Sequence, residues 1–76
     1  MPDINKLKTE FEQRKQEYIQ SQRNFANALR AAMRTGSRKE LSEYLRQARN
    51  QDKARDRYYR VAEKLRGALL QSTKQA

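Results

Sequence analysis

The sequence predicts an all-α protein, a two-helix antiparallel hairpin of the coiled-coil type. Apolar residues recur every seven positions in two long segments, as in helices that pack side by side. A single glycine, Gly36, separates the two segments, and no stretch alternates apolar and polar residues as a strand does. We expect one domain over 1–76, with a first helix at about 3–34, a turn at 35–37 and a second helix at about 38–72.

The first helix is predicted from its apolar repeat and its ends. The repeat consists of Ile4, Phe11, Tyr18, Phe25 and Ala32, with Leu7, Ala28 and Leu29 beside it. Asp3 is a suitable N-cap, because its side chain can accept a hydrogen bond from a free backbone N–H of the first turn. Arg30 and Arg34 lie in the last turns, where positive charge suits the helix dipole.

The turn is the most specific local signal in the chain. Gly36 can adopt the left-handed conformation that ends a helix, and Ser37 with Glu40 matches the S-x-x-E capping box that begins one. The sequence therefore predicts a stop and a restart within a few residues.

The second helix carries two neighbouring stripes with the same period. One stripe contains Leu41, Ala48, Arg55, Ala62 and Leu69, and the other contains Tyr44, Gln51, Tyr58 and Leu65. We expect both stripes to face the first helix. Gly67 lies within this helix and should weaken it by about 1 kcal/mol relative to alanine.

A turn near Gly36 should bring together residues whose numbers add to about 73. The expected pairs are Ile4 with Leu69, Phe11 with Ala62, Phe25 with Ala48, Leu29 with Tyr44, and Tyr18 with Arg55. Large rings would thus lie opposite small side chains. The middle of the contact would be polar, with Arg55 either over the ring of Tyr18 or paired with Asp52.

Charge and composition limit the possible functions. Lys and Arg number 18 against nine Asp and Glu, a net charge of +9 that favours acidic partners. The chain has no cysteine and no histidine, which excludes disulfides, thiolate nucleophiles and the usual zinc ligand sets. There is also no glycine-rich phosphate loop and no carboxylate pair suited to catalysis, so we expect no enzyme and no cofactor.

The apolar runs are short. None approaches the roughly 18 residues that a membrane-spanning helix requires, so we expect no membrane insertion. The first residues lack the apolar core of a secretory signal, and we therefore expect a cytoplasmic protein.

The second helix also carries a row of cations at steps of three and four residues. At 100° per residue they fall within a sector of about 80°, and the row is about 27 Å long. No acidic residue shares the sector, and the row is expected to lie opposite the apolar stripes. We call this row the basic ridge: Arg46, Arg49, Lys53, Arg57, Arg60 and Lys64. A row of this kind is suited to neutralising a phosphate backbone, although a solvated helix face is the alternative explanation.

Two further surfaces are predicted. The turn end is positive, and we call Arg30, Arg34, Arg38 and Lys39 the basic tip. Several apolar residues fall outside the expected helix contact: Ile19, Met33, Leu45, Tyr59 and Leu70. Two helices cannot cover this second apolar face, which predicts a homodimer in a four-helix bundle or, alternatively, a different protein as partner.

These observations predict a binding protein. The leading hypothesis is a small dimer that docks on nucleic acid, RNA or DNA, through the basic ridge. The alternative is a protein interaction module, such as an assembly factor, adaptor, chaperone or inhibitor, that binds an acidic protein surface. No motif beyond the turn indicates a known family.

Overall fold

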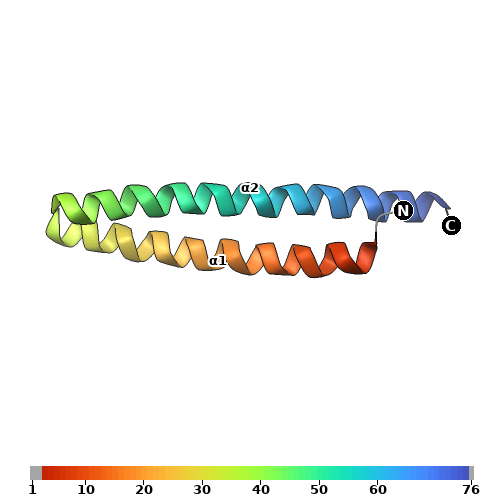
Figure 1. Cartoon of the computed structure of the whole chain (residues 1–76), viewed down its shortest axis with the longest axis horizontal. Coiled ribbons are helices and arrows are strands. Elements are labelled where there is room, and N and C mark those ends of the chain that lie inside the picture. Colours follow the sequence, from red (N-terminus) through yellow and green to blue (C-terminus); the bar gives the residue numbers. More distant parts are fainter. Residues whose placement is uncertain (1–2, 76) are drawn as a thin grey trace.

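In the computed structural model, which describes residues 3–75 and the side chains of residues 3–73, the chain forms two helices joined by a tight turn. Helix α1 spans Ile4–Thr35 and helix α2 spans Arg38–Gln75. The two helices lie side by side and antiparallel, and α2 continues past the start of α1 at the open end, the end opposite the turn (Figure 1). The Cα atoms form a rod of 58 × 13 × 13 Å. The predicted helical hairpin is confirmed.

The caps of α1 are those that the sequence predicted. Asp3 Oδ1 accepts a hydrogen bond from the backbone N–H of Lys6 at 3.2 Å. At the other end Gly36 has a φ of 61°, and its N–H donates to the carbonyl oxygen of Ala32 at 2.8 Å. This left-handed conformation is strained for a residue with a Cβ atom, which explains the glycine.

At the start of α2, one of the two hydrogen bonds of the predicted capping box is present. Ser37 Oγ accepts a hydrogen bond from the backbone N–H of Glu40 at 3.2 Å. The backbone N–H of Ser37 donates to Thr35 Oγ1 at 3.3 Å, so the last residue of α1 takes the place predicted for the Glu40 side chain. The turn thus ties the end of α1 directly to the start of α2.

The contact between the helices, which we call the seam, lies where predicted on α1 but one residue away from prediction on α2. The side chains buried on α2 are Ala54, Val61 and Ala68. They pack with the stripe that contains Tyr58, while Leu41 and Leu69 of the other predicted stripe are 47% and 43% exposed. The predicted stripe Leu41, Ala48, Arg55, Ala62 and Leu69 is therefore wrong as part of the seam.

The reason for this shift lies at the middle of the hairpin. The predicted stripe would bury Arg55, and removing a guanidinium from water without a partner is costly. The observed seam places the small Ala54 there instead, near the middle of α1 where Ser21 is also buried. Arg55 stays at the edge, where it pairs with Asp52 at 3.6 Å and Asp56 at 3.4 Å. The sequence had predicted the Asp52 pairing as one of two solutions.

Aromatic rings meet one another across the seam. The ring of Tyr58 lies between those of Phe11 and Tyr18, with centroid distances of 5.2 and 5.7 Å, and Phe25 lies 5.3 Å from Tyr44. The numbers of these paired residues add to 69 or 76, on either side of the expected 73. The tyrosine stripe, which was expected to face α1, thus supplies the rings that Phe11 and Phe25 meet, and Ala48 and Ala62, the partners expected for those rings, are only half-buried.

Outside the turn, no ion pair or side-chain hydrogen bond of the described residues joins the two helices. Within the described side chains every ion pair joins residues of one helix, as Arg14 and Glu17 do at 3.0 Å. The buried hydroxyl of Ser21 donates to the carbonyl oxygen of Tyr18 at 2.7 Å, also within α1. Apolar packing along the seam therefore holds the hairpin together. No large side chain among the described residues is fully buried, so this core is thin.

Candidate nucleic-acid interface

The hairpin has two broad sides that differ in chemistry. Because a helix turns by about 100° per residue, a residue just before a seam position lies on one broad side and a residue just after it lies on the other. Because the helices are antiparallel, the residues that directly precede seam residues on α1 lie on the same broad side as the residues that directly precede seam residues on α2. We call it the ridge side, and we call the opposite one the outer apolar side.

The basic ridge lies on the ridge side. Arg46, Lys53, Arg57, Arg60 and Lys64 each come directly before a seam residue, and Arg49 lies slightly farther around α2. All six are exposed along one continuous helix, so they form one row. The row lies about 120° around the helix from the seam. The expectation that it lies directly opposite the seam is therefore wrong, and the cations are accessible beside α1.

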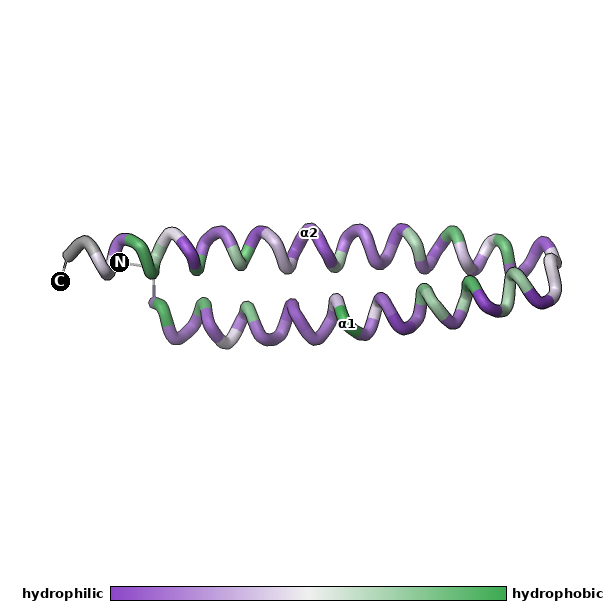
Figure 2. The backbone as a smooth tube through the Cα atoms, turned by 180° about the vertical axis from the view of Figure 1, so that it is seen from behind, coloured by the Kyte–Doolittle hydropathy of each residue, from purple (hydrophilic) through white to green (hydrophobic). Residues whose placement is uncertain are grey.

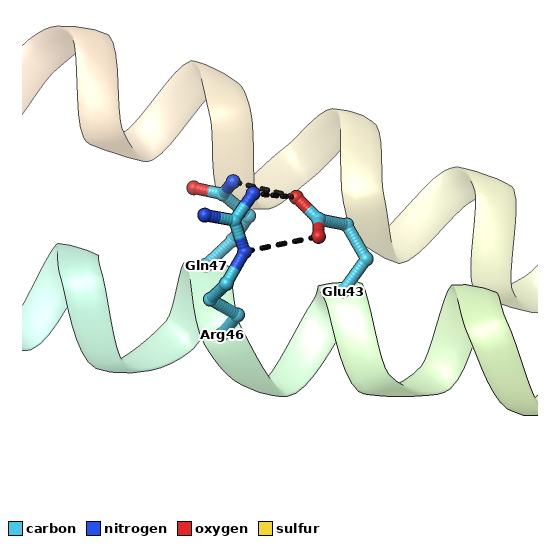
Figure 3. A network of polar contacts seen from close by, with 3 residues as sticks. All are labelled: Glu43, Arg46 and Gln47. Carbon is cyan, nitrogen blue, oxygen red and sulfur yellow. Dashed lines mark hydrogen bonds and ion pairs between the residues drawn. The ribbon is translucent and has the colours of Figure 1, made fainter.

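One ridge cation is already occupied. The guanidinium of Arg46 donates two hydrogen bonds to the carboxylate of Glu43, at 2.6 and 3.0 Å, and Gln47 Nε2 donates to the same carboxylate at 2.9 Å (Figure 3). The hydrogen bonds from Arg46 and Gln47 lower the pKa of Glu43 from 4.5 to about 2, and the carboxylate raises the pKa of Arg46. Glu43 lies three residues before Arg46, and this spacing is the sequence signal for the pair.

The other five ridge cations form no salt bridge within the described part of the chain. Their charges are therefore available to an external anion. Their exposure also means that each is strongly hydrated in the free protein, so a partner must supply several anionic groups in a row to bind well.

Helix α1 changes character along the ridge side. Toward the open end this side carries Glu10 and Glu17, and toward the turn it carries the amides Gln20, Asn24 and Asn27. Gln20 Nε2 donates to Asn24 Oδ1 at 3.1 Å. Helix α1 has no acidic residue after Glu17, so toward the turn the acidic group on the ridge side is Glu43 of α2, which is paired with Arg46.

The basic tip is divided between two surfaces. Lys39 lies seven residues before Arg46 and continues the ridge toward the turn, and Arg38 lies at its edge. Arg30 is exposed on the side of α1 that faces away from α2, whereas Arg34 lies seven residues after Asn27 and is exposed on the ridge side. Arg30 donates to Asn27 Oδ1 at 3.3 Å. The ridge side therefore carries Lys39 and Arg34 of the basic tip, whereas Arg30 faces away from it.

The predicted second apolar face lies on the outer apolar side. Ile19, Met33, Leu45 and Tyr59 each come directly after a seam residue, and Leu70 lies farther around α2. All except the half-buried Ile19 are more than half exposed. Sequence reasoning missed Ala26, Leu29, Leu41 and Ala48 as members of this face, because their places follow from the observed seam.

The described residues offer little else that could form a site. Shallow hollows occur beside Gln13 on α1 and beside Tyr59 on α2, and each is lined by residues of one helix only. Within the described residues no group of three acidic side chains is placed to hold a metal ion, and neither helix is long and apolar enough to cross a membrane.

Comparisons with known proteins gave no match. No protein-family model matches the sequence, and searches of curated proteins and of solved structures found no significant similarity.

Proposed function

We propose that this protein binds nucleic acid as a homodimer and docks on the phosphate backbone through the basic ridge. The proposed activity is binding and not catalysis, and the partner is recognised by charge and shape, not by base sequence. One observation carries the proposal: a row of exposed cations without salt-bridge partners follows one side of α2. This row consists of Arg49, Lys53, Arg57, Arg60 and Lys64.

The geometry suits a linear polyanion. The cations follow one another at steps of three or four residues, which is about 4.5 to 6 Å along the helix axis. A globular acidic patch would meet only part of such a row, whereas a phosphate backbone carries charge along its whole length. The amide side chains on the ridge side of α1 add hydrogen-bond donors next to the cations.

The homodimer is proposed because the hairpin is thinly packed. Six large hydrophobic side chains remain at least 43% exposed, and no large side chain among the described residues is fully buried. A second hairpin would cover part of this surface and leave the ridge side free.

The test is a salt titration of binding, measured by fluorescence anisotropy on a labelled duplex RNA, a duplex DNA and a single strand. If four or five phosphates are engaged, log Kd should change with log salt with a slope of roughly 4 on a duplex and roughly 3 on a single strand. The double variant Lys53→Glu with Arg57→Glu should bind at least tenfold more weakly and reduce the slope by about two.

A matched control separates the ridge from overall charge. Arg23→Glu with Arg30→Glu changes the net charge by the same amount, and both residues are exposed on the side of α1 that faces away from α2. This control should retain most of the wild-type affinity and slope. Equal losses in the two double variants would show that binding follows net charge, and the ridge would not be the site.

The alternative is an acidic protein partner. If the wild type binds none of the three nucleic acids more tightly than about 100 μM at low salt, the nucleic-acid proposal fails. The ridge together with the exposed outer apolar side would then favour docking on an acidic protein surface.

A further inference from the structure

The outer apolar side is not uniform along the hairpin. Its uncharged part lies toward the turn, and we call it the turn-end patch: Ala26, Leu29, Met33, Leu41, Leu45 and Ala48. Met33 is 72% exposed and Leu45 is 55% exposed. Figure 2 shows hydrophobic positions on both helices near the turn, and on α2 also near the open end.

Toward the open end the same side is charged. Helix α1 carries Lys8, Glu12 and Lys15 there, and α2 carries Arg66 there as well as Asp52 and Arg55 near its middle. Between Ile19 and the end of α1, by contrast, the residues that directly follow seam positions include no charged one. Any partner for this side must therefore be apolar at one end and hydrated at the other.

We infer that the turn-end patch is covered by the turn-end patch of a second copy of this chain, with both turns at the same end of a four-helix bundle. The inference rests on the homodimer part of the proposed function and not on the identity of the polyanion.

The charged residues of the open half disfavour a dimer in which two fully overlapping hairpins point in opposite directions. That arrangement would place Met33 and Leu45 of one copy over the charged open half of the other, which contains Lys8, Glu12 and Arg66. Apolar side chains would then be removed from water together with charges that lose hydration and gain no partner. With the turns at the same end, the turn-end patches cover each other, and in the open halves the apolar stems of the long charged side chains lie within the contact while their charged groups reach water at its edges.

Two hairpins that overlapped only in part would bury too little surface for a stable dimer. From Leu41 to Leu69 the outer apolar side is about 42 Å long and about two helix diameters, or 20 Å, wide. Full overlap thus covers roughly 800 Å² per copy, which is the size of a standard stable interface. Two hairpins in opposite directions that overlap only at their turn halves would cover about half of this area, below what a stable dimer needs.

The ridge remains accessible in this bundle. It lies on the opposite broad side of each hairpin, so association of the outer apolar sides leaves both ridges exposed on the outside. Dimer formation and binding of a polyanion therefore use separate surfaces and can be tested separately.

The first experiment measures mass without nucleic acid. Light scattering at micromolar concentration should give twice the 9.1 kDa chain mass for the wild type. Leu45→Glu should give a monomer with unchanged helical circular dichroism, because this side chain is exposed in the single hairpin. The control Asn50→Glu makes the same change of charge on the ridge side and should remain a dimer.

The second experiment measures direction. The chain has no cysteine, so Gln71→Cys near the open end provides a single site for a nitroxide label. Electron spin resonance should give a distance of roughly 20 to 30 Å between labels if the turns share one end, because only helix diameters separate the two labels. Either arrangement in opposite directions separates the labels by more than about 40 Å, because full overlap of two 58 Å rods places the labels near opposite ends.

Each outcome bears on one proposal. A wild-type monomer, a Leu45→Glu dimer or a label distance above about 40 Å overturns the inference. A dimer with the short distance that binds no nucleic acid supports the inference and rejects only the proposed ligand. A monomer that binds nucleic acid through the ridge does the reverse.

Discussion

The substitution Ala54→Glu tests where the seam runs on α2. Ala54 is 9% exposed in the middle of the seam, and no cation lies in the seam there to pair with a carboxylate. An unpaired buried charge costs about 3 to 5 kcal/mol, and in a seam only one layer deep we expect about 2 to 4 kcal/mol. This is a large share of the roughly 5 kcal/mol expected for a chain of this size.

The assay is urea unfolding followed by circular dichroism, at one low protein concentration for all variants. The matched substitution is Ala62→Glu, which lies on the stripe that the sequence predicted for the seam but is only half-buried beside Val61. It should cost less than about 1 kcal/mol, because its carboxylate can reach water.

The pH dependence of stability provides a second test of the buried position of Ala54. Desolvation raises the pKa of the carboxyl introduced at Ala54 above its unfolded value, so the loss of stability is smallest at low pH and grows as the pH rises through 4 to 7. The reasoning is refuted if Ala62→Glu is the more destabilising of the two variants, since the seam would then follow the predicted stripe.

Three further predictions concern local structure. Gly67→Ala should stabilise α2 by about 1 kcal/mol in urea unfolding, because no atom lies within 4 Å of the added Cβ, whereas Gly36→Ala should destabilise the hairpin at its φ of 61°. Ser37→Ala should cost about 1 kcal/mol by removing the N-cap of α2, and no loss would contradict the cap. The Glu43 carboxyl should titrate near pH 2 by NMR and nearer 4.5 in Arg46→Gln; its contribution to stability is thus present above pH 4.5 and is lost as the pH falls toward 2.

Local sequence signals were sufficient to predict the hairpin. The caps at Asp3, Gly36 and Ser37 are local hydrogen bonds and one backbone conformation, which depend on neighbouring residues only. The seam on α1 could be predicted for a similar reason, because its aromatic repeat has no competing stripe. The ridge also follows from helical spacing alone, so its cations were identified before any packing was known.

Which stripe of α2 faces α1 depends on packing between the helices and could not be predicted from the sequence. The tyrosine stripe has a neighbouring stripe on each side, one containing Ala54 and the other containing Arg55. Both neighbours repeat every seven residues, so periodicity could not show which of them faces α1. The choice depends on the partner helix, where a small residue permits close approach and a guanidinium would lose its water. That one-residue rotation exposes Leu41 and Leu69, and it moves the ridge to one broad side and the apolar patch to the other, because both are defined relative to the seam.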